Sequence, residues 1–190
     1  DVYKRQGVTT IEQGAFHLCT ELASVSLPST LTTIEKDVFH GCTSLASITV
    51  PAGVTTIEIG AFKECTSLAS ITVPAGVTTI GIGAFHFCTK LASVSLPSTL
   101  TAIGSGAFAD CTSLASITIP KSVTSFPQPV TPDELRDENG VVFKNCDKLK
   151  TVTFESPRAN DVKLTLKMFE NCTALEEIDL PEKVLFELQG

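Results

Sequence analysis

The sequence predicts an α/β-type repeat solenoid dominated by β-structure, in which turns of 23 residues stack around one core. Three observations support this prediction: phenylalanine, cysteine and proline each recur every 23 residues over the first two thirds of the 190-residue chain. A unit this short cannot bury its own apolar side, whereas stacked copies share a continuous core. The recurring residues are Phe16, Phe39, Phe62, Phe85 and Phe108; Cys19, Cys42, Cys65, Cys88 and Cys111; and Pro28, Pro51, Pro74, Pro97 and Pro120.

Each turn contains two short extended segments. In the first, Val25 and Leu27 alternate with a serine, which is the period of a strand, and Pro28 ends the strand because it has no N–H. Residues 8–11 form the second, which is rich in β-branched side chains. The sequence Gly-Ala-Phe-x-x-Cys predicts a tight turn and one helical turn with Phe and Cys on one face. Strands of successive turns should pair in parallel, about 4.8 Å apart.

The repeat resembles the BspA-type (bacterial surface antigen-like) leucine-rich repeat family. The pattern L-x-x-I-x-L-P-x-x-[VL]-T-x-I-x-x-x-A-F-x-x-C-x-x runs from Val8 to about Pro181, in five regular copies and two distorted ones. The resemblance implies a right-handed leucine-rich repeat solenoid with a parallel β-sheet on its concave face. It also implies a secreted or cell-surface protein, of the kind often associated with adhesion to host or extracellular-matrix proteins.

We expect residues 1–190 to form a single solenoid and to be a fragment of a longer protein, because no signal segment opens the chain although the family is usually exported. Regular repeats span about 8–120, two distorted repeats span 121–181, and 182–190 begin a partial turn. The second part carries an insert at 127–140, after which Phe143 takes the role of the repeat phenylalanine. We interpret Val141–Phe143 as a strand of a small hairpin and 163–168 as a slightly lengthened second strand. The insert is either a binding loop or a tolerated surface insertion.

The composition excludes several kinds of partner. The net charge is −7, which argues against nucleic acid and anionic membranes because both require a basic patch. The chain lacks the run of about 18 apolar residues that a spanning helix requires, so no membrane insertion is expected. Of the charged side chains, 13 lie in residues 1–120 and 22 in residues 121–190. The regular repeats therefore present a mostly neutral surface.

The two positions that flank the central Val or Ile of the first strand should face the concave side of the solenoid in every turn. They form a column of hydroxyls that becomes acidic at the last turn. Two interpretations stay open: small hydroxyl residues suit a tightly stacked sheet, or the column is a polar face that binds a protein or glycan. The candidate binding surface is Ser24, Ser26, Ser47, Thr49, Ser70, Thr72, Ser93, Ser95, Ser116, Thr118, Thr151, Thr153, Glu177 and Asp179.

Cysteine and histidine give no sign of a metal, a cofactor or catalysis. The seven cysteines, including Cys146 and Cys172, share one repeat position and form no Cys-x-x-Cys pair, so we interpret them as a ladder of free thiols in the core. His17, His40 and His86 each follow the repeat phenylalanine and should be exposed. The sequence thus favours a non-enzymatic, adhesion-like module that binds a host or matrix protein or a glycan. The alternative is a passive structural spacer in a longer surface protein.

Overall fold

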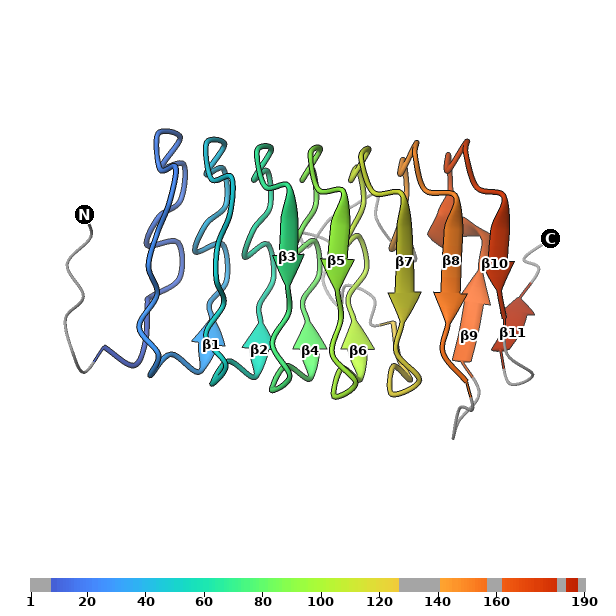
Figure 1. Cartoon of the computed structure of the whole chain (residues 1–190), viewed down its shortest axis with the longest axis horizontal. Helices are drawn as coiled ribbons and strands as arrows, with labels where there is room; N and C mark the ends of the chain where they lie inside the picture. Colours follow the sequence, from blue (N-terminus) through green and yellow to red (C-terminus); the bar gives the residue numbers. More distant parts are fainter. Residues whose placement is uncertain (1–7, 127–140, 157–161, 181–183, 188–190) are drawn as a thin grey trace.

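The structure, a computed structural model, describes residues 8–126, 141–156, 162–180 and 184–187, with the backbone alone at 162–163 and 184–187. The chain is a solenoid whose turns follow one another along the long axis of the molecule, with the first described turn at one end of the stack and β10 and β11 at the other (Figure 1). Its strands pair in parallel, and helix is almost absent. The predicted repeat solenoid is therefore confirmed.

Two columns of strands run along the stack, and their arrows point in opposite directions in Figure 1. The first column contains two parallel sheets, β3 with β5 and β7 with β8 and β10. The second contains the four-stranded parallel sheet β1-β2-β4-β6 and the pair β9 with β11. The first-column strands are β3 (Ser70–Thr72), β5 (Ser93–Ser95), β7 (Ser116–Ile119), β8 (Thr151–Phe154) and β10 (Glu177–Asp179). The second-column strands are β1 (Thr33–Ile34), β2 (Thr56–Ile57), β4 (Thr79–Ile80), β6 (Ala102–Ile103), β9 (Val162–Thr165) and β11 (Val184–Glu187).

The strand register follows the repeat register of the sequence. Ile71 of β3 pairs with Val94 of β5, and Thr56 of β2 pairs with Thr79 of β4, so each residue lies beside its own copy in the next turn. The same holds across the insert, where Ser116 of β7 pairs with Thr151 of β8. Equivalent side chains therefore form straight columns, which is the property that positions the candidate surface.

The repeat phenylalanines form a continuous stack in the core. Between Phe16 and Phe108, neighbouring rings lie 5.4 Å apart between centroids, with interplanar angles of 3–11°. Phe143 and Phe169 extend the stack at 5.9 and 5.7 Å. Offset stacking of this kind adds about 0.5–1.5 kcal/mol per pair to the burial of the rings. Phe143 thus takes the place of the repeat phenylalanine beyond the insert, as the sequence predicts.

The helical turn predicted at Gly-Ala-Phe-x-x-Cys is wrong. In the third turn the N–H of Phe62 donates to the carbonyl of Ala84 in the next turn, 2.8 Å away, so it does not make an intrahelical bond. Gly60 and Glu64 both have positive φ (62° and 59°), which bends the chain on either side of the ring and stops a helix from propagating. The helix η1 (Leu166–Phe169), a 3-10 turn in the last repeat, is the sole helix of the described ranges.

Other local predictions also need correction. Val141–Phe143 is not a strand: it is the buried turn that carries the ring of Phe143 into the core. The extended segment expected at 163–168 ends at Thr165, where η1 begins. In the first two turns, segments 24–27 and 47–50 are not strands, and neither is 8–11. The insert at 127–140 lies outside the described residues.

Candidate binding face

The candidate surface lies on the face of the first strand column, and its side chains point away from the core. In β3, Ser70 and Thr72 are exposed while Ile71 between them is 3% exposed, as the alternation of a strand requires. Ten of the twelve predicted hydroxyl residues are exposed, and Thr151 and Thr153 are half-buried. We call these twelve residues the hydroxyl face: Ser24, Ser26, Ser47, Thr49, Ser70, Thr72, Ser93, Ser95, Ser116, Thr118, Thr151 and Thr153.

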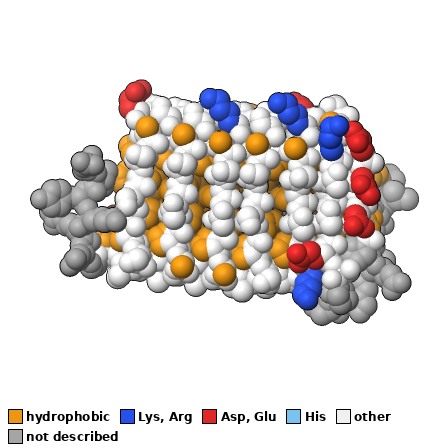
Figure 2. Space-filling view, viewed as in Figure 1, with side chains coloured by type: hydrophobic (Ala, Val, Ile, Leu, Met, Phe, Trp, Pro, Cys, Tyr) orange, Lys and Arg blue, Asp and Glu red, His pale blue; other side chains and the backbone are white. Residues whose placement is uncertain are grey.

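The charge of this face changes along the stack. Figure 2 shows uncharged side chains over the middle turns and acidic side chains gathered at the C-terminal end. That end is β10, where Glu177 and Asp179 occupy the two hydroxyl positions and both are exposed. Beside them, Lys150 Nζ lies 3.0 Å from Glu176 Oε1 in an ion pair between exposed side chains. The structure therefore brings the predicted hydroxyls into one row and ends that row on carboxylates.

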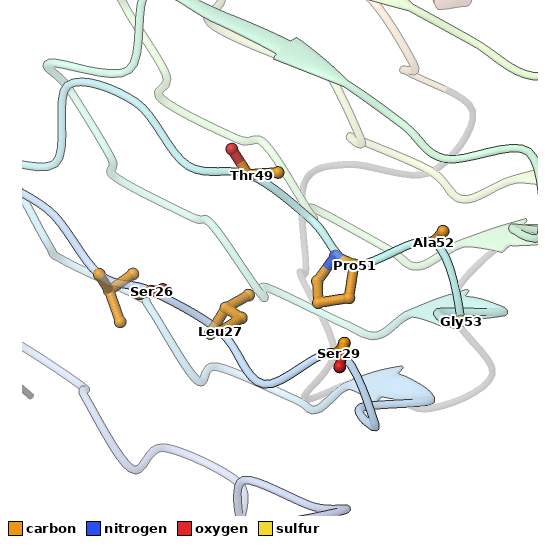
Figure 3. A pocket seen from close by; sticks show the side chains of 8 residues that line it. Ser26, Leu27, Ser29, Thr49, Pro51, Ala52 and Gly53 are labelled. Carbon is orange, nitrogen blue, oxygen red and sulfur yellow. The ribbon is translucent and has the colours of Figure 1, made fainter. Parts of the chain in front are cut away.

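A groove opens in this face between the first two turns, where the first strand column lacks a ladder. It has a volume of about 350 Å³. Figure 3 shows side chains of both turns around it, with Ser26 and Leu27 from the first turn and Thr49 and Pro51 from the second. We call it the inter-turn groove, and it is lined by Val25, Ser26, Leu27, Ser29, Thr49, Pro51, Ala52 and Gly53.

The histidines lie beside the phenylalanine stack, one residue after each ring, and only His17 is exposed as predicted. His40 is half-buried, with Nε2 3.4 Å from Glu64 Oε1 and Nδ1 3.7 Å from Asp37 Oδ1. His86 is buried, with Nε2 3.2 Å from Asp110 Oδ2. Burial and the charge of Lys63 lower the pKa of His86, against the opposing effect of Asp110. Within the described ranges, no group of three or more histidine, cysteine or acidic side chains is placed to hold a metal ion.

Comparison with known proteins identifies the repeat. The family model described as "BspA type Leucine rich repeat region" matches residues 9–130 and 130–187 in six copies. The chain belongs to the BspA-type leucine-rich repeat family. Curated proteins give no match.

Solved structures of bacterial leucine-rich repeat proteins resemble this BspA-type chain. A Treponema pallidum leucine-rich repeat protein is 33% identical with a TM-score of 0.73, and the match covers 86% of this chain and 72% of that one. A leucine-rich repeat protein from Bacteroides ovatus is 25% identical with a TM-score of 0.53, covering 94% and 66%. The pneumococcal vaccine antigen PcpA shares the fold at 24% identity and a TM-score of 0.53, covering 85% and 51%. The chain thus spans between half and three quarters of these three proteins.

The cysteine column of this BspA-type solenoid is a ladder of hydrogen-bonded thiols. From the second turn on, each Sγ donates to the carbonyl of the phenylalanine in the preceding turn, as Cys65 does to Phe39 at 3.2 Å. All seven cysteines are free thiols. Burial raises the pKa of Cys42 to about 11 and that of Cys88 to about 12, which keeps these thiols protonated and unreactive at neutral pH. The sulfur-to-oxygen distances are 3.0–3.2 Å for Cys42, Cys65, Cys88, Cys111, Cys146 and Cys172.

Two features of the surface are absent from the sequence-based prediction. The residue before each cysteine has positive φ in every turn, and its occupants are Leu18, Gly41, Glu64, Phe87, Asp110, Asn145 and Asn171. Because these residues share no side-chain type, the sequence pattern hides the shared backbone conformation. The inter-turn groove was also missed. Its sequence signal is the order of the loops after proline, Ser29-Thr30 in the first turn and Ala52-Gly53 in the second.

Proposed function

We propose that this chain is a non-enzymatic module of a cell-surface or secreted protein, and that it binds a protein or glycan through the hydroxyl face in an adhesion-like role. The observation that carries the proposal is the row of outward-facing hydroxyls, which is uncharged over the regular turns. A hydroxyl both donates and accepts hydrogen bonds, so such a row offers many polar contacts without a charge to desolvate.

The construction of the face favours binding. In the first-column strands the hydroxyl pair is anchored by a core residue between its two members, as Ser93 and Ser95 are by Val94 in β5. The backbone beneath this pair is held to β3 of the preceding turn by the parallel ladder. Serine and threonine have few rotamers to lose, so ordering them against a ligand costs less free energy than ordering long side chains.

The location and the non-catalytic character are further parts of the proposal. Membership of the BspA-type family supports a surface or secreted location. None of the helices in the described ranges has the length and apolar character needed to cross a bilayer. The buried, protonated thiols are poor nucleophiles, and His40 and His86 lie beside the carboxylates of Glu64 and Asp110. These features support a binding role without chemistry.

The test is a binding screen against extracellular-matrix proteins and immobilised glycans. It compares the intact chain with a variant that carries Thr72→Lys and Ser95→Lys at the centre of the hydroxyl face. Thr124→Lys, at an exposed threonine of the second strand column, is the matched control. We expect saturable binding by the intact chain and the control and its loss in the face variant. Equal binding by all three proteins would exclude the hydroxyl face as the site.

A passive spacer is the second candidate function, and the uniform core favours it. Identical ring spacings of 5.4 Å along the regular turns make a stiff stack whose length is set by the number of repeats. A folded chain that binds nothing in the screen supports the spacer. A third variant, with 127–140 replaced by a short Gly/Ser turn, tests whether binding depends on the insert instead.

A further inference from the structure

The inter-turn groove exists because the first two turns are joined on one side and separated on the other. Near the phenylalanine stack, Phe16 N–H donates to Val38 carbonyl at 2.9 Å and Leu18 N–H donates to His40 carbonyl at 2.7 Å. On the strand side, segments 24–27 and 47–50 are not strands, and the ladder begins only at β3. The first two turns are therefore joined near the phenylalanine stack and separated on the strand side, which leaves room for a ligand there.

The loops after proline explain why the groove lies between these two turns. At the third and fourth turns, Thr99 follows an Ala-Gly loop and fills the space by donating to the carbonyls of Ala75 and Val77, at 2.7 and 2.8 Å. The equivalent residue is a glycine in both the second and the third turn, Gly53 and Gly76, and the two differ in how closely the preceding turn approaches. A Cβ at Gly53 would lie 3.3 Å from Leu31 carbonyl oxygen, whereas a Cβ at Gly76 would lie 3.0 Å from the corresponding oxygen. The loops are thus packed less closely at the groove.

The lining of the groove combines hydroxyls with small apolar surfaces and contains no charged residue. Ser26, Ser29 and Thr49 are exposed. Their hydroxyls make no hydrogen bond to any other group of the residues that the structure describes. Leu27 and Pro51 supply the apolar wall. Because these hydroxyls are satisfied by solvent alone, a ligand with matching donors and acceptors can replace that solvent.

We propose that the inter-turn groove binds one uncharged sugar residue of a glycan, an inference that rests on the proposed function and names the ligand class for one part of the face. A sugar ring carries hydroxyls that donate and accept, and it has a C–H face that packs on leucine and proline. The absence of charge in the lining argues against sulfated and acidic sugars, which require a cation. The volume of about 350 Å³ lies at the small end of ligand pockets, as a single sugar unit requires.

A peptide is the competing occupant, and the lining favours the sugar over it. Peptide recognition relies on an exposed strand edge or on a deep apolar or charged pocket for anchor side chains. The segments 24–27 and 47–50, which are in no ladder, offer such an edge, but the groove is lined by hydroxyls and small apolar groups and includes no aromatic or charged residue to hold an anchor side chain. Its free polar groups are hydroxyls on both walls, an arrangement that matches a ligand with hydroxyls around a ring.

The experiment measures binding of methyl glycosides of glucose, galactose, mannose and N-acetylglucosamine by saturation-transfer NMR and titration. The groove variant carries Ser26→Ala and Thr49→Val. The matched control carries Ser98→Ala and Thr124→Val, the same types of change at exposed residues outside both the groove and the hydroxyl face. We expect at least one glycoside to bind. Each lost hydroxyl in the groove should weaken binding about fivefold, and the control should bind as the intact chain does.

A second variant, Ala52→Leu, fills the groove without removing a hydroxyl, and we expect it to abolish the glycoside signal while circular dichroism and the melting temperature stay unchanged. The proposal is overturned if none of the glycosides binds, or if the groove variant binds as tightly as the control. If the intact chain binds a matrix protein or peptide that Thr72→Lys with Ser95→Lys abolishes, while no glycoside binds, the hydroxyl face keeps its function and the sugar groove is excluded.

Discussion

The five regular turns at residues 8–120 and the two diverged turns beyond them stack around the same kind of core but differ in their surface residues. Both parts share the ring stack and the thiol-to-carbonyl bond, which is 3.2 Å at Cys65 and 3.0 Å at Cys172. The diverged part nevertheless contains the longer ladder of the second strand column, in which β9 and β11 pair over four residues, whereas β1 and β2 pair over two. Near-identical repeats therefore do not make the longer ladders.

The left-handed position before each cysteine shows the difference most clearly. In the diverged turns it holds asparagines that connect to one another: Asn171 Nδ2 donates to Asn145 Oδ1, and Asn145 Nδ2 donates to Asp110 Oδ1, both at 2.8 Å. In the regular turns the same position varies: it holds Gly41 and Asp110, but also side chains poorly suited to positive φ, such as Leu18 and Phe87. The core pattern tolerates this strain, so the ring and thiol columns dominate the fold.

The largest effect is expected from breaking the ring stack. Phe62→Ala removes a fully buried ring with a stacked neighbour on either side, and it should cost about 3–5 kcal/mol of unfolding free energy. If the stack is continuous across the insert, Phe143→Ala should cost as much, because its ring is equally buried. Phe16→Ala, at a half-buried ring, is the control and should cost less. The measurement is urea unfolding followed by circular dichroism.

A cost below about 1 kcal/mol at Phe143, with the full cost at Phe62, would contradict a single stack. The diverged turns would then unfold as a separate unit, as repeat arrays do when the coupling between neighbours is weak.

The next effect is a loss of stability at alkaline pH. The buried thiols of Cys42 and Cys88 have pKa values raised from 9.0 to about 11 and about 12, so they stay protonated when the unfolded chain's thiols ionise. The unfolded state then binds fewer protons, and the unfolding free energy falls as the pH rises above about 9, by about 1.4 kcal/mol per pH unit for each such thiol. Below pH 9 this contribution is fully present.

Urea midpoints at pH 8, 9, 10 and 11 check this prediction, and two variants compare the regions. Cys88→Ala should flatten the alkaline slope. Cys172→Ala should not, because the neighbouring Cys146 thiol lowers the pKa of the half-exposed Cys172 thiol. Equal slopes in the intact chain and in Cys88→Ala would show that the buried thiol does not govern the alkaline response.

The sequence predicted the features that follow from the 23-residue spacing, which are the columns of equivalent side chains along the stack. Spacing of 23 residues placed Phe39, Phe62 and Phe85 in one stack, and it placed Ser70 and Thr72 on the outer face, because a fixed period in a solenoid puts like residues above one another. The same reasoning located Phe143 beyond the insert, where the spacing changes but the Phe-x-x-Cys unit does not.

The features that were missed depend on backbone conformation and on pairs of neighbouring turns. The helical turn predicted around Phe62 fails because its N–H bonds to the next turn, a choice that spacing within one repeat does not reveal. The donor role of each thiol was hidden, since a buried cysteine resembles any small apolar residue in a repeat pattern. The inter-turn groove results from one particular succession of loops, Ser29-Thr30 followed by Ala52-Gly53.

A smaller effect is expected from interrupting the asparagine ladder of the diverged part. Asn145→Leu removes the hydrogen bonds to Asp110 and Asn171 and places at φ 57° the side-chain type found at Leu18. We expect a loss of about 2 kcal/mol, from strain and from the two bonds together. Asn145→Gly removes the same two bonds, but glycine adopts this positive φ without strain. We therefore expect it to lose only about 1 kcal/mol of unfolding free energy. Thermal unfolding of the three proteins measures both changes, and equal losses would show that strain contributes nothing.

The smallest effect is expected when an asparagine, as found before the cysteine in the diverged turns, is placed at the same position of a regular turn. Phe87 has φ 59° and is 41% exposed, so Phe87→Asn relieves backbone strain at the cost of the ring contact with His86, whose centroid lies 4.3 Å away. Asparagine tolerates this conformation, and we expect a gain of about 0.5–1 kcal/mol and a rise of about 2 °C in the melting temperature. Phe87→Ala, which loses the ring and keeps the strain, should melt below the intact chain. If Phe87→Asn also melts lower, the stacking of Phe87 on His86 outweighs the strain, and the regular turns are adapted to their own side chains.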